Sequence, residues 1–181
     1  AVPSTPADNY ALLKAAIRCD DPVVYMEHKN LWPLEGEVSD AEEVAEFGEA
    51  RTVREGGDVT IVSWSASVHV AAAAAEALAG EGIDAEVIDL RTLWPWDRDA
   101  VFASVGKTGR LLVVHEAVAV AGFGAEIAAS VAEHMHKALK APVRRLGAPR
   151  IPISYAPTLE DEARVTAGAV GDAVRKLLQA E

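Results

Sequence analysis

The sequence predicts an α/β fold with three layers, in which a mainly parallel, twisted sheet carries helices on both faces. From residue 58 onward, short runs rich in valine, isoleucine and leucine alternate with longer segments of helical periodicity. This alternation predicts parallel strands joined by right-handed crossovers. Hydrophobic residues make up 50% of the 181 residues and charged residues 25%, so the chain can bury a substantial core.

Four strands are expected in this alternating part of the chain. Each is short, is rich in β-branched or aliphatic residues and is flanked by turn residues. They lie at residues 59–64, 85–90, 111–115 and 142–146, and the last has a proline at its first position. The strand at 111–115 is apolar up to its final histidine, which predicts burial on both faces.

The expected helices are marked by capping residues and glycines. Ser67 and Asp97 are expected to cap the first two helices of this part, and Gly80, Gly106 and Gly109 are expected to end them. Two further helices are expected, one opening at Gly122-Phe123-Gly124 and running to about residue 139, and one over the apolar stripe of Val170, Ala173, Val174, Leu177 and Leu178. Residues 147–157 hold three prolines and predict an irregular connection.

The first 28 residues predict a helix followed by a strand. Thr5-Pro6-Ala7-Asp8 is a helix start, because threonine caps free amides and proline suits the first helical position. Asp20-Asp21-Pro22 ends that helix, and a strand is expected at 23–26. The helix carries an apolar stripe of Leu12, Leu13, Ala16 and Ile17. Because no sheet in this chain covers the stripe, we expect oligomerisation or disorder at the amino end.

Three units are therefore expected along the chain. Residues 1–28 form the helix–strand unit, 29–50 form an acidic, solvated linker, and 51–181 form the α/β domain. The chain begins without a methionine, in sequence typical of the middle of a protein, so we expect a segment of a longer chain.

The charge balance limits the classes of partner. Lysine and arginine number 17 against 28 acidic residues, which gives a net charge of −11 at pH 7. This balance argues against nucleic acid and anionic membranes and suits a basic protein partner. One cysteine, Cys19, excludes a disulfide within the chain and suits the cytoplasm. No apolar run approaches the roughly 20 residues that span a bilayer, so no membrane is expected.

His115-Glu116 is the pair that most resembles a site, because it falls at the carboxyl end of a parallel strand. A histidine beside a carboxylate can transfer protons. No second converging group is evident, which favours a structural or interface role. Gly122-Phe123-Gly124-Ala125-Glu126 could offer helix amides to a phosphate. It lacks the third glycine of the dinucleotide motif, so a tight turn and close helix packing explain it better.

The remaining candidates have plain structural explanations. Trp64-Ser65-Ala66-Ser67 stands between a strand and a helix like a nucleophile elbow, but the flanking glycines are missing. His134 and His136 point to different faces of a helix and are expected to face solvent. Cys19 is expected to be half-buried and inert. No catalytic or cofactor-binding residue is assigned. The absence of a convincing active site favours an assembly module. The alternative is a free-standing, flavodoxin-like module that binds a small anion or nucleotide at 122–126 or near His115.

An ordered set of motifs then becomes specific. It comprises Pro3-Ser4-Thr5-Pro6, Leu12 to Arg18, Asp21-Pro22-Val23-Val24, Glu27-His28-Lys29, Gly57 to Val62, Ala85 to Leu93, Lys107-Thr108-Gly109-Arg110, His115-Glu116-Ala117, Gly122 to Ala128 and Ala141-Pro142-Val143. Together these resemble the beta subunit of thiamine-diphosphate-dependent 2-oxo acid dehydrogenases of the pyruvate, branched-chain 2-oxo acid or acetoin type. The resemblance covers nearly the whole chain, in order.

The resemblance implies that residues 1–28 are the tail of the pyrimidine-binding domain and that 51–181 form a transketolase C-terminal-like domain. It implies oxidative decarboxylation of a 2-oxo acid with acyl transfer to lipoyl groups by the whole enzyme. The carboxylate that activates the cofactor and the catalytic histidine of this family lie upstream of Pro3, so this segment is expected to be inactive alone. Thiamine diphosphate and magnesium belong to the full enzyme, and which 2-oxo acid is used is not indicated.

The resemblance also implies a metal site and partners. Some members hold a structural potassium ion through main-chain carbonyls, and the matching positions here are Ala16, Ile17, Cys19 and Asp21. Cys19 replaces a common acidic residue, and Asp21 replaces an asparagine of some relatives. The implied partners are the alpha subunit, a second beta subunit in a heterotetramer, and the subunit-binding domain of the dihydrolipoyl acyltransferase.

Overall fold

Five strands form one sheet in the order β1-β3-β2-β4-β5. The computed structural model describes residues 1–39 and 45–180. The three central strands are β2 (Val59–Ser63), β3 (Ala85–Asp89) and β4 (Leu111–Val118), and they are parallel to one another. β5 (Arg144–Ala148) continues the parallel sheet at one edge. The predicted α/β fold is confirmed, and each of the four expected strands is present.

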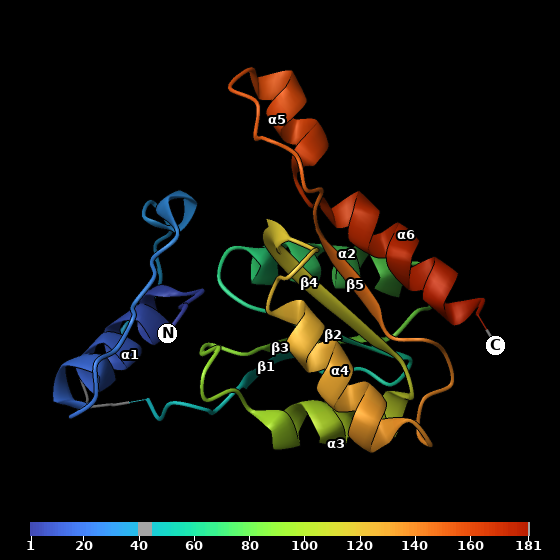
Figure 1. Cartoon of the computed structure of the whole chain (residues 1–181), viewed down its shortest axis with the longest axis horizontal. Coiled ribbons are helices and arrows are strands. Elements are labelled where there is room, and N and C mark those ends of the chain that lie inside the picture. The colour runs from blue at the N-terminus through green and yellow to red at the C-terminus, as the bar shows by residue number, and fades with distance from the viewer. Residues whose placement is uncertain (40–44, 181) are drawn as a thin grey trace.

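Helices cover both faces of the sheet, as expected (Figure 1). On one face, α2 (Ser67–Ala79) packs with α6 (Ala167–Leu178). On the other face, α3 (Arg98–Thr108) packs with α4 (Gly124–Met135). Asp97 caps α3 by accepting from the amide of Ala100, and Gly109 ends this helix at φ +74°, a conformation that glycine adopts without strain.

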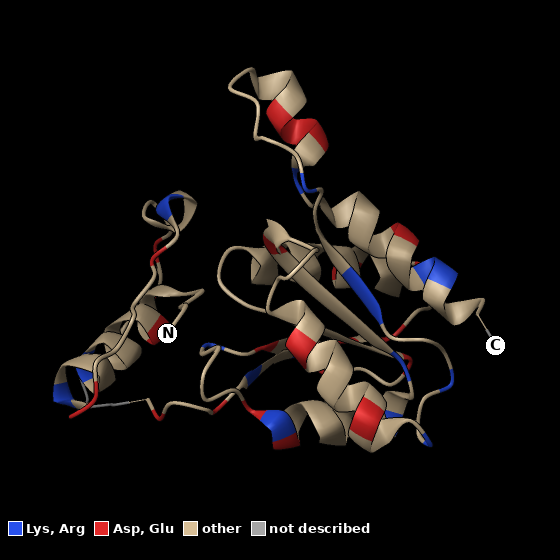
Figure 2. Ribbon diagram, in the orientation of Figure 1, with Lys and Arg blue, Asp and Glu red and all other residues tan. Residues whose placement is uncertain are grey.

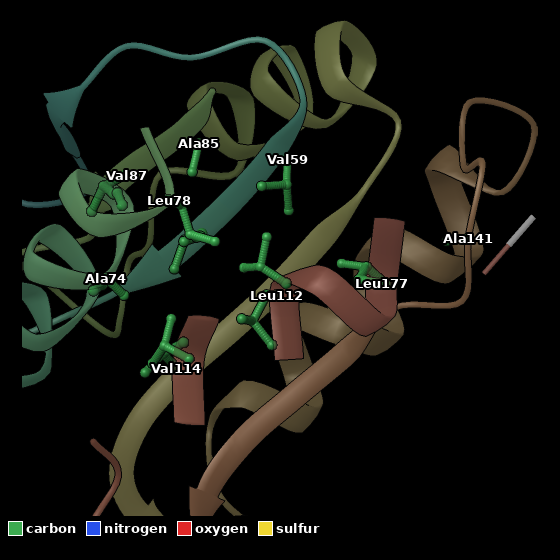
Figure 3. Close-up of a cluster of buried hydrophobic side chains, with 14 residues drawn as sticks. Val59, Ala74, Leu78, Ala85, Val87, Leu112, Val114, Ala141 and Leu177 are labelled. Atoms are coloured by element: carbon green, nitrogen blue, oxygen red, sulfur yellow. The ribbon is translucent and has the colours of Figure 1, made fainter. Parts of the chain in front are cut away.

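Neighbouring residues of each central strand face opposite layers, which gives the protein two cores. Ile61 joins the core beneath α2 and α6, whereas Val62 joins the core beneath α3 and α4. Leu112 and Leu111 divide in the same way. Figure 3 shows the first core, where Leu78 and Leu177 meet the strand side chains. The continuous apolar runs of the sequence follow from this burial on both faces.

Several expected boundaries and caps were wrong. Ser67 does not cap α2: it is the first helical residue, and the cap position belongs to Ala66, whose methyl group cannot accept a hydrogen bond. Gly106 lies inside α3 rather than at its end. α4 ends at Met135, short of residue 139, and β5 begins at Arg144 rather than at the proline, which has no amide to give to a sheet.

Two elements of the domain were missed. β1 (Arg51–Arg54) lies antiparallel to β3 at the sheet edge, and α5 (Pro157–Ala163) follows the proline-rich connection. β1 was missed because charged residues interrupt its apolar pattern, and α5 because it buries only Ala163. A 3-10 helix at Lys29–Leu31 also lies in the expected linker. Of that linker, residues 40–44 lie outside the described residues.

The amino-terminal helix is confirmed, but the strand after it is wrong. α1 (Pro6–Arg18) begins at Thr5, whose hydroxyl accepts from the amide of Asp8. Residues 23–26 are extended, yet among residues 1–39 and 45–180 their backbone groups bond only to Ala1, which donates to Val24 and accepts from Met26. A strand needs a ladder of consecutive pairs, and one residue cannot supply it. No helix in the described part of the chain is long and apolar enough to cross a bilayer.

Candidate functional site at the carboxyl edge of the sheet

The chain reverses its direction of winding between β2 and β4, which are neighbours in the sheet. In open α/β sheets, ligands bind in the crevice beyond the carboxyl ends of such strands. Here side chains occupy that position. Trp64, directly after β2, stacks on His115 of β4 with ring centroids 5.2 Å apart, and Phe123 meets Trp64 edge-on at 6.0 Å. Trp64 and His115 are both buried, so their side chains fill the space between the ends of β2 and β4.

His115 is held inside the sheet as a neutral ring. Its Nδ1 lies 2.9 Å from the carbonyl oxygen of Ala117, which can only accept, so Nδ1 carries the proton. The Nε2 lone pair has no hydrogen-bond partner and lies beside Gly124 at the start of α4. Burial lowers the pKa of His115, and the charge of Arg145 lowers it further, while the hydrogen bond to Ala117 opposes this shift. A fully buried neutral histidine is a packing residue, as favoured for the His115-Glu116 pair.

Three glycines form the cradle of the His115 ring. A Cβ atom at Gly122, Gly124 or Gly147 would lie 2.7 or 2.8 Å from an atom of the imidazole. At Gly147 it would also lie 2.7 Å from the carbonyl oxygen of Ala117. The glycines at 122 and 124 are therefore needed for close packing, which confirms that interpretation over phosphate binding.

A buried ionic cluster fastens the amino-terminal segment to the same edge. Asp89, at the end of β3, is fully buried and accepts a 2.5 Å hydrogen bond from the hydroxyl of Ser4. The Arg51 guanidinium of β1 lies 3.1 Å from Asp89 and 3.3 Å from Asp8 of α1. Arg91 approaches Asp8 at 3.5 Å, and its carbonyl accepts from the amide of Val2. Two positive and two negative side chains thus join three segments.

Asp89 is a charged residue of this cluster whose side chain is fully buried. Burial raises the pKa of its carboxyl group, and the Ser4 hydroxyl, the Arg91 amide and the Arg51 charge oppose that rise. The net rise means that the ionised form is less favourable here than in water. The negative charge of Asp89 at neutral pH therefore depends on the Ser4 hydroxyl, the Arg91 amide and the Arg51 guanidinium together.

A second fastening involves the other half of the His115-Glu116 pair. Glu116 points outward, and its carboxylate lies 2.6 Å from Nε2 of His28, in the segment after α1. The other ring nitrogen of His28 accepts from the amide of Asn30, so Nε2 is the donor to Glu116. Nearby, the Tyr25 hydroxyl donates to Asn9 of α1, and burial raises the pKa of Tyr25. Glu116 is thus an interface residue rather than part of a proton-transfer pair.

Two cavities lie around the amino-terminal segment rather than at the sheet edge. The first, about 510 Å³, runs along α1 and is lined by Leu13, Ile17 and Trp32 among others. The second, about 500 Å³, is lined by Cys19 and Asp21 together with Trp94 and other apolar groups. His115 and Gly124 line neither of them. Leu13 and Ile17 are exposed on α1, so oligomerisation through this helix stays a prediction.

The four potassium candidates lie around the end of α1. Ala16 and Ile17 belong to its last turn, Cys19 follows in extended conformation, and Asp21 is exposed. Among residues 1–39 and 45–180, no three or more side chains of histidine, cysteine, aspartate or glutamate cluster as metal ligands. A metal site built from these four positions would therefore depend on main-chain oxygens.

The other sequence candidates are placed as follows. His134 and His136 are exposed, and Cys19 is half-buried, as expected. Ser65 adopts φ +53° in the turn after β2, the local shape of a nucleophile elbow. Within the described residues, no histidine or carboxylate bonds its hydroxyl, so it lacks an activating base. Sequence reasoning missed Asp89 and Arg51. The signal for Asp89 was a carboxylate at the end of an expected strand, which is ambiguous without its partner, and Arg51 lies at the start of a strand that sequence reasoning also missed.

Comparisons with known proteins agree with this arrangement. The sequence model of the family described as "Transketolase, C-terminal domain" matches residues 48–170. The chain is 48% identical over 177 residues to the acetoin:2,6-dichlorophenolindophenol oxidoreductase subunit beta of Cupriavidus necator, covering 98% of this chain and 52% of that protein. It is 42% identical over 180 residues to the 2-oxoisovalerate dehydrogenase subunit beta of Bacillus subtilis, covering 98% of this chain and 55% of that protein.

A solved transketolase structure has a fold similar to that of this chain. The structure named "Split gene transketolase, inactive beta4 tetramer" superposes with a TM-score of 0.79 at 28% identity, covering 99% of this chain and 56% of that chain. The chain thus spans about half the length of the curated relatives and of the solved structure that it matches.

Proposed function

Because the chain belongs to the transketolase C-terminal domain family, as its match over residues 48–170 shows, we propose that it is the scaffold part of a 2-oxo acid dehydrogenase beta subunit. The observation that carries this proposal is the filled crevice between β2 and β4. Trp64 and His115 take the place of a ligand, while Glu116 and Asp89 hold another segment of the chain. Side chains that pack against one another and hold another segment of the chain suit a structural role better than a catalytic one.

In this proposal the whole enzyme decarboxylates a 2-oxo acid oxidatively and passes the acyl group to a lipoyl group. The beta-subunit names of the relatives support it, and so does their near-complete coverage of this chain. Thiamine diphosphate supplies the carbanion chemistry when bound. The residues of this chain contribute by ordering the carboxyl edge, and the cofactor and its magnesium are held elsewhere. We propose the cytoplasm as its compartment.

The proposed division of the chain follows from the same contacts. Residues 1–28 serve as the tail of the pyrimidine-binding domain, and 29–50 link them to the domain at 51–181. The bonds from Ser4 to Asp89 and from His28 to Glu116 support a fixed junction between these parts. The proposed partners are an alpha subunit, a second beta subunit and the subunit-binding domain of a dihydrolipoyl acyltransferase. The beta4 assembly named for the related solved structure supports pairing between copies.

A small-anion or nucleotide module is the weaker candidate. It would use the start of α4 or the surroundings of His115. The start of α4 is packed against the imidazole, and a fully buried ring offers no surface to a ligand. Neither of the two cavities described above is lined by His115 or by Gly124.

A chimera with the 2-oxoisovalerate dehydrogenase beta subunit of Bacillus subtilis tests the proposed function. The stretch that matches this chain is replaced by residues 1–181, and the product is co-expressed with the alpha subunit of that enzyme. We expect the chimera to assemble and to oxidise 2-oxoisovalerate, with 2,6-dichlorophenolindophenol as electron acceptor, within about tenfold of the parent rate. A Gly147→Ala chimera is the matched control and should assemble poorly. An assembled but inactive chimera, or turnover of a 2-oxo acid by the isolated chain, would contradict the proposal.

We also propose that main-chain carbonyls of Ala16, Ile17, Cys19 and Asp21 hold a potassium ion. The last turn of a helix leaves carbonyls without helical partners, and α1 ends at Arg18, so the oxygen donors suit a hard cation. The melting temperature should be higher in KCl than in NaCl at equal concentration. Asp21→Asn should keep this difference, because only the main chain binds the ion. Equal melting temperatures in the two salts would exclude the site.

A further inference from the structure

The side-chain oxygen and the main-chain oxygen of Ser4 are both bonded to the α/β domain. Ser4 lies just before α1 and is fully buried. Its hydroxyl donates to Asp89 of β3 at 2.5 Å, and its carbonyl oxygen lies 2.7 Å from Nε2 of His69, on α2. A carbonyl oxygen can only accept, so Nε2 of His69 carries the proton. One residue of the amino-terminal segment is thus bonded to two separate elements of the domain.

The Ser4 hydroxyl is not needed to start α1. Thr5 caps that helix by accepting from the amide of Asp8, which is the local interaction that begins it. Neither of the two hydrophobic cores includes Ser4. The hydrogen bonds of Ser4 therefore fix where α1 lies relative to the sheet, rather than whether α1 or the sheet forms.

The backbone on either side of Ser4 is stiff. The rings of Pro3 and Pro6 fix the φ angle of each residue, and the cap ties Thr5 to α1. In Figure 2 this stretch is tan, because residues 1–7 hold no lysine, arginine, aspartate or glutamate. Ser4 is therefore held by hydrogen bonds, whose strength depends on direction as well as distance.

A change of orientation at Ser4 is carried along the whole of α1. The helix has 13 residues and is therefore about 20 Å long, so a tilt of about 10° at its start moves its far end by about 3 Å. Misplacement of reacting groups by about 1 Å can slow a reaction by about 100-fold. A shift of α1 can therefore change a reaction rate without any change in the groups that touch substrate.

We propose that Ser4 is a positioning residue for the oxidation of 2-oxo acids by the whole enzyme. The inference rests on the proposed function, in which residues 1–28 belong to the pyrimidine-binding domain and 51–181 to the transketolase C-terminal-like domain. Ser4 acts through α1: its bonds to Asp89 and His69 set the orientation of one domain on the other.

Ser4→Ala in the Bacillus subtilis chimera tests the proposal. We expect kcat for 2-oxoisovalerate to fall at least about tenfold while KM stays within about threefold, because placement rather than substrate binding is lost. The matched control is Ser63→Ala, which removes another buried hydroxyl, one that donates to the carbonyl oxygen of Val114 within the sheet. Both variants should lower the melting temperature similarly, whereas the control should keep the parent kcat. Equal kcat in the two variants would overturn the role of Ser4.

His69 provides a second pair of variants at an exposed position. In His69→Gln the side-chain amide can still donate to the Ser4 carbonyl oxygen, whereas His69→Leu has no donor. The loss of one hydrogen bond should lower kcat at least about threefold in His69→Leu, and His69→Gln should stay close to the parent. Both variants should fold, because the side chain is exposed. The same kcat in the two variants would contradict the proposal.

Hydrogen exchange on the 181-residue chain measures the placement without the reaction. The amide of Val2 donates to the carbonyl oxygen of Arg91 at 2.8 Å, two residues before Ser4. It should exchange at least about tenfold faster in Ser4→Ala than in Ser63→Ala, and equal rates would overturn the proposal. An inactive parent chimera would contradict the proposed function, and the kinetic role of Ser4 with it. An active parent chimera with equal kcat in the two serine variants would overturn the role of Ser4 only.

Discussion

Replacing Gly147 with alanine should lower the free energy of unfolding by about 3 kcal/mol, the upper part of the range for overpacked cores. The new methyl group would lie 2.7 Å from the carbonyl oxygen of Ala117, 3.1 Å from the amide nitrogen of Ala119 and 2.8 Å from the His115 ring. Two of these atoms are backbone, so no change of rotamer can relieve the contact. Urea unfolding at pH 7 measures the loss.

Gly168→Ala is the matched control for that substitution. Gly168 lies in the first turn of α6, and the nearest atom to a new Cβ would be the Thr166 hydroxyl at 3.9 Å. Alanine there should be neutral or stabilising by up to about 1 kcal/mol, because it favours the helix. Equal effects of the two substitutions would mean that the cradle around His115 is loose, which would remove the steric reason for its glycines.

Replacing Arg51 with methionine should destabilise the protein by about 3 kcal/mol at pH 7, the lower end of the range for breaking a buried ion pair. The lower end applies because the Arg51 side chain is 36% exposed, whereas Asp89 is fully buried. Methionine keeps the length of the side chain but leaves Asp89 and Asp8 with less positive charge. Hydrogen exchange should also increase at the amide of Val2, whose partner Arg91 belongs to the same cluster.

The loss in the Arg51 variant should shrink as the pH falls. The pKa of Asp89 is raised in the folded protein, so the native carboxyl group binds a proton more readily than the unfolded one. Its contribution to stability is complete below the ordinary aspartate pKa and is lost as pH rises through the folded value. Without Arg51 that value rises further, so the difference from the parent protein should be smaller at pH 5 than at pH 7.

Two substitutions complete this test. Arg51→Lys should show an intermediate loss, because an ammonium keeps the charge but cannot present the guanidinium fork to two carboxylates. Asp84→Asn removes an exposed pair with Arg54 and should cost less than about 1 kcal/mol. A loss in Arg51→Met that stays constant from pH 7 to pH 5 would show that packing of the side chain, rather than its charge, holds the junction.

Part of the carboxyl edge could be predicted from the sequence. The position of His115 at a strand end and the glycines at 122 and 124 were visible, and close packing was the correct reason for those glycines. The role of Gly147 was not visible, because it lies more than 30 residues from His115 in the chain and meets the ring only through the pairing of β4 with β5. Ser67 was assigned as a cap because local pattern cannot distinguish the cap position from the first helical residue.

The sequence by itself determined the layered α/β fold, since the alternation of apolar strands and amphipathic helices depends on neighbouring residues. It also determined the caps at Thr5 and Asp97, where donor and acceptor are three residues apart. Only the tertiary structure decided that Trp64 and His115 fill the crevice, and that Ser4 reaches Asp89 across 85 positions. The free energy of such contacts depends on burial and distance, and these are set when separate elements pack together rather than by the order of residues along the chain.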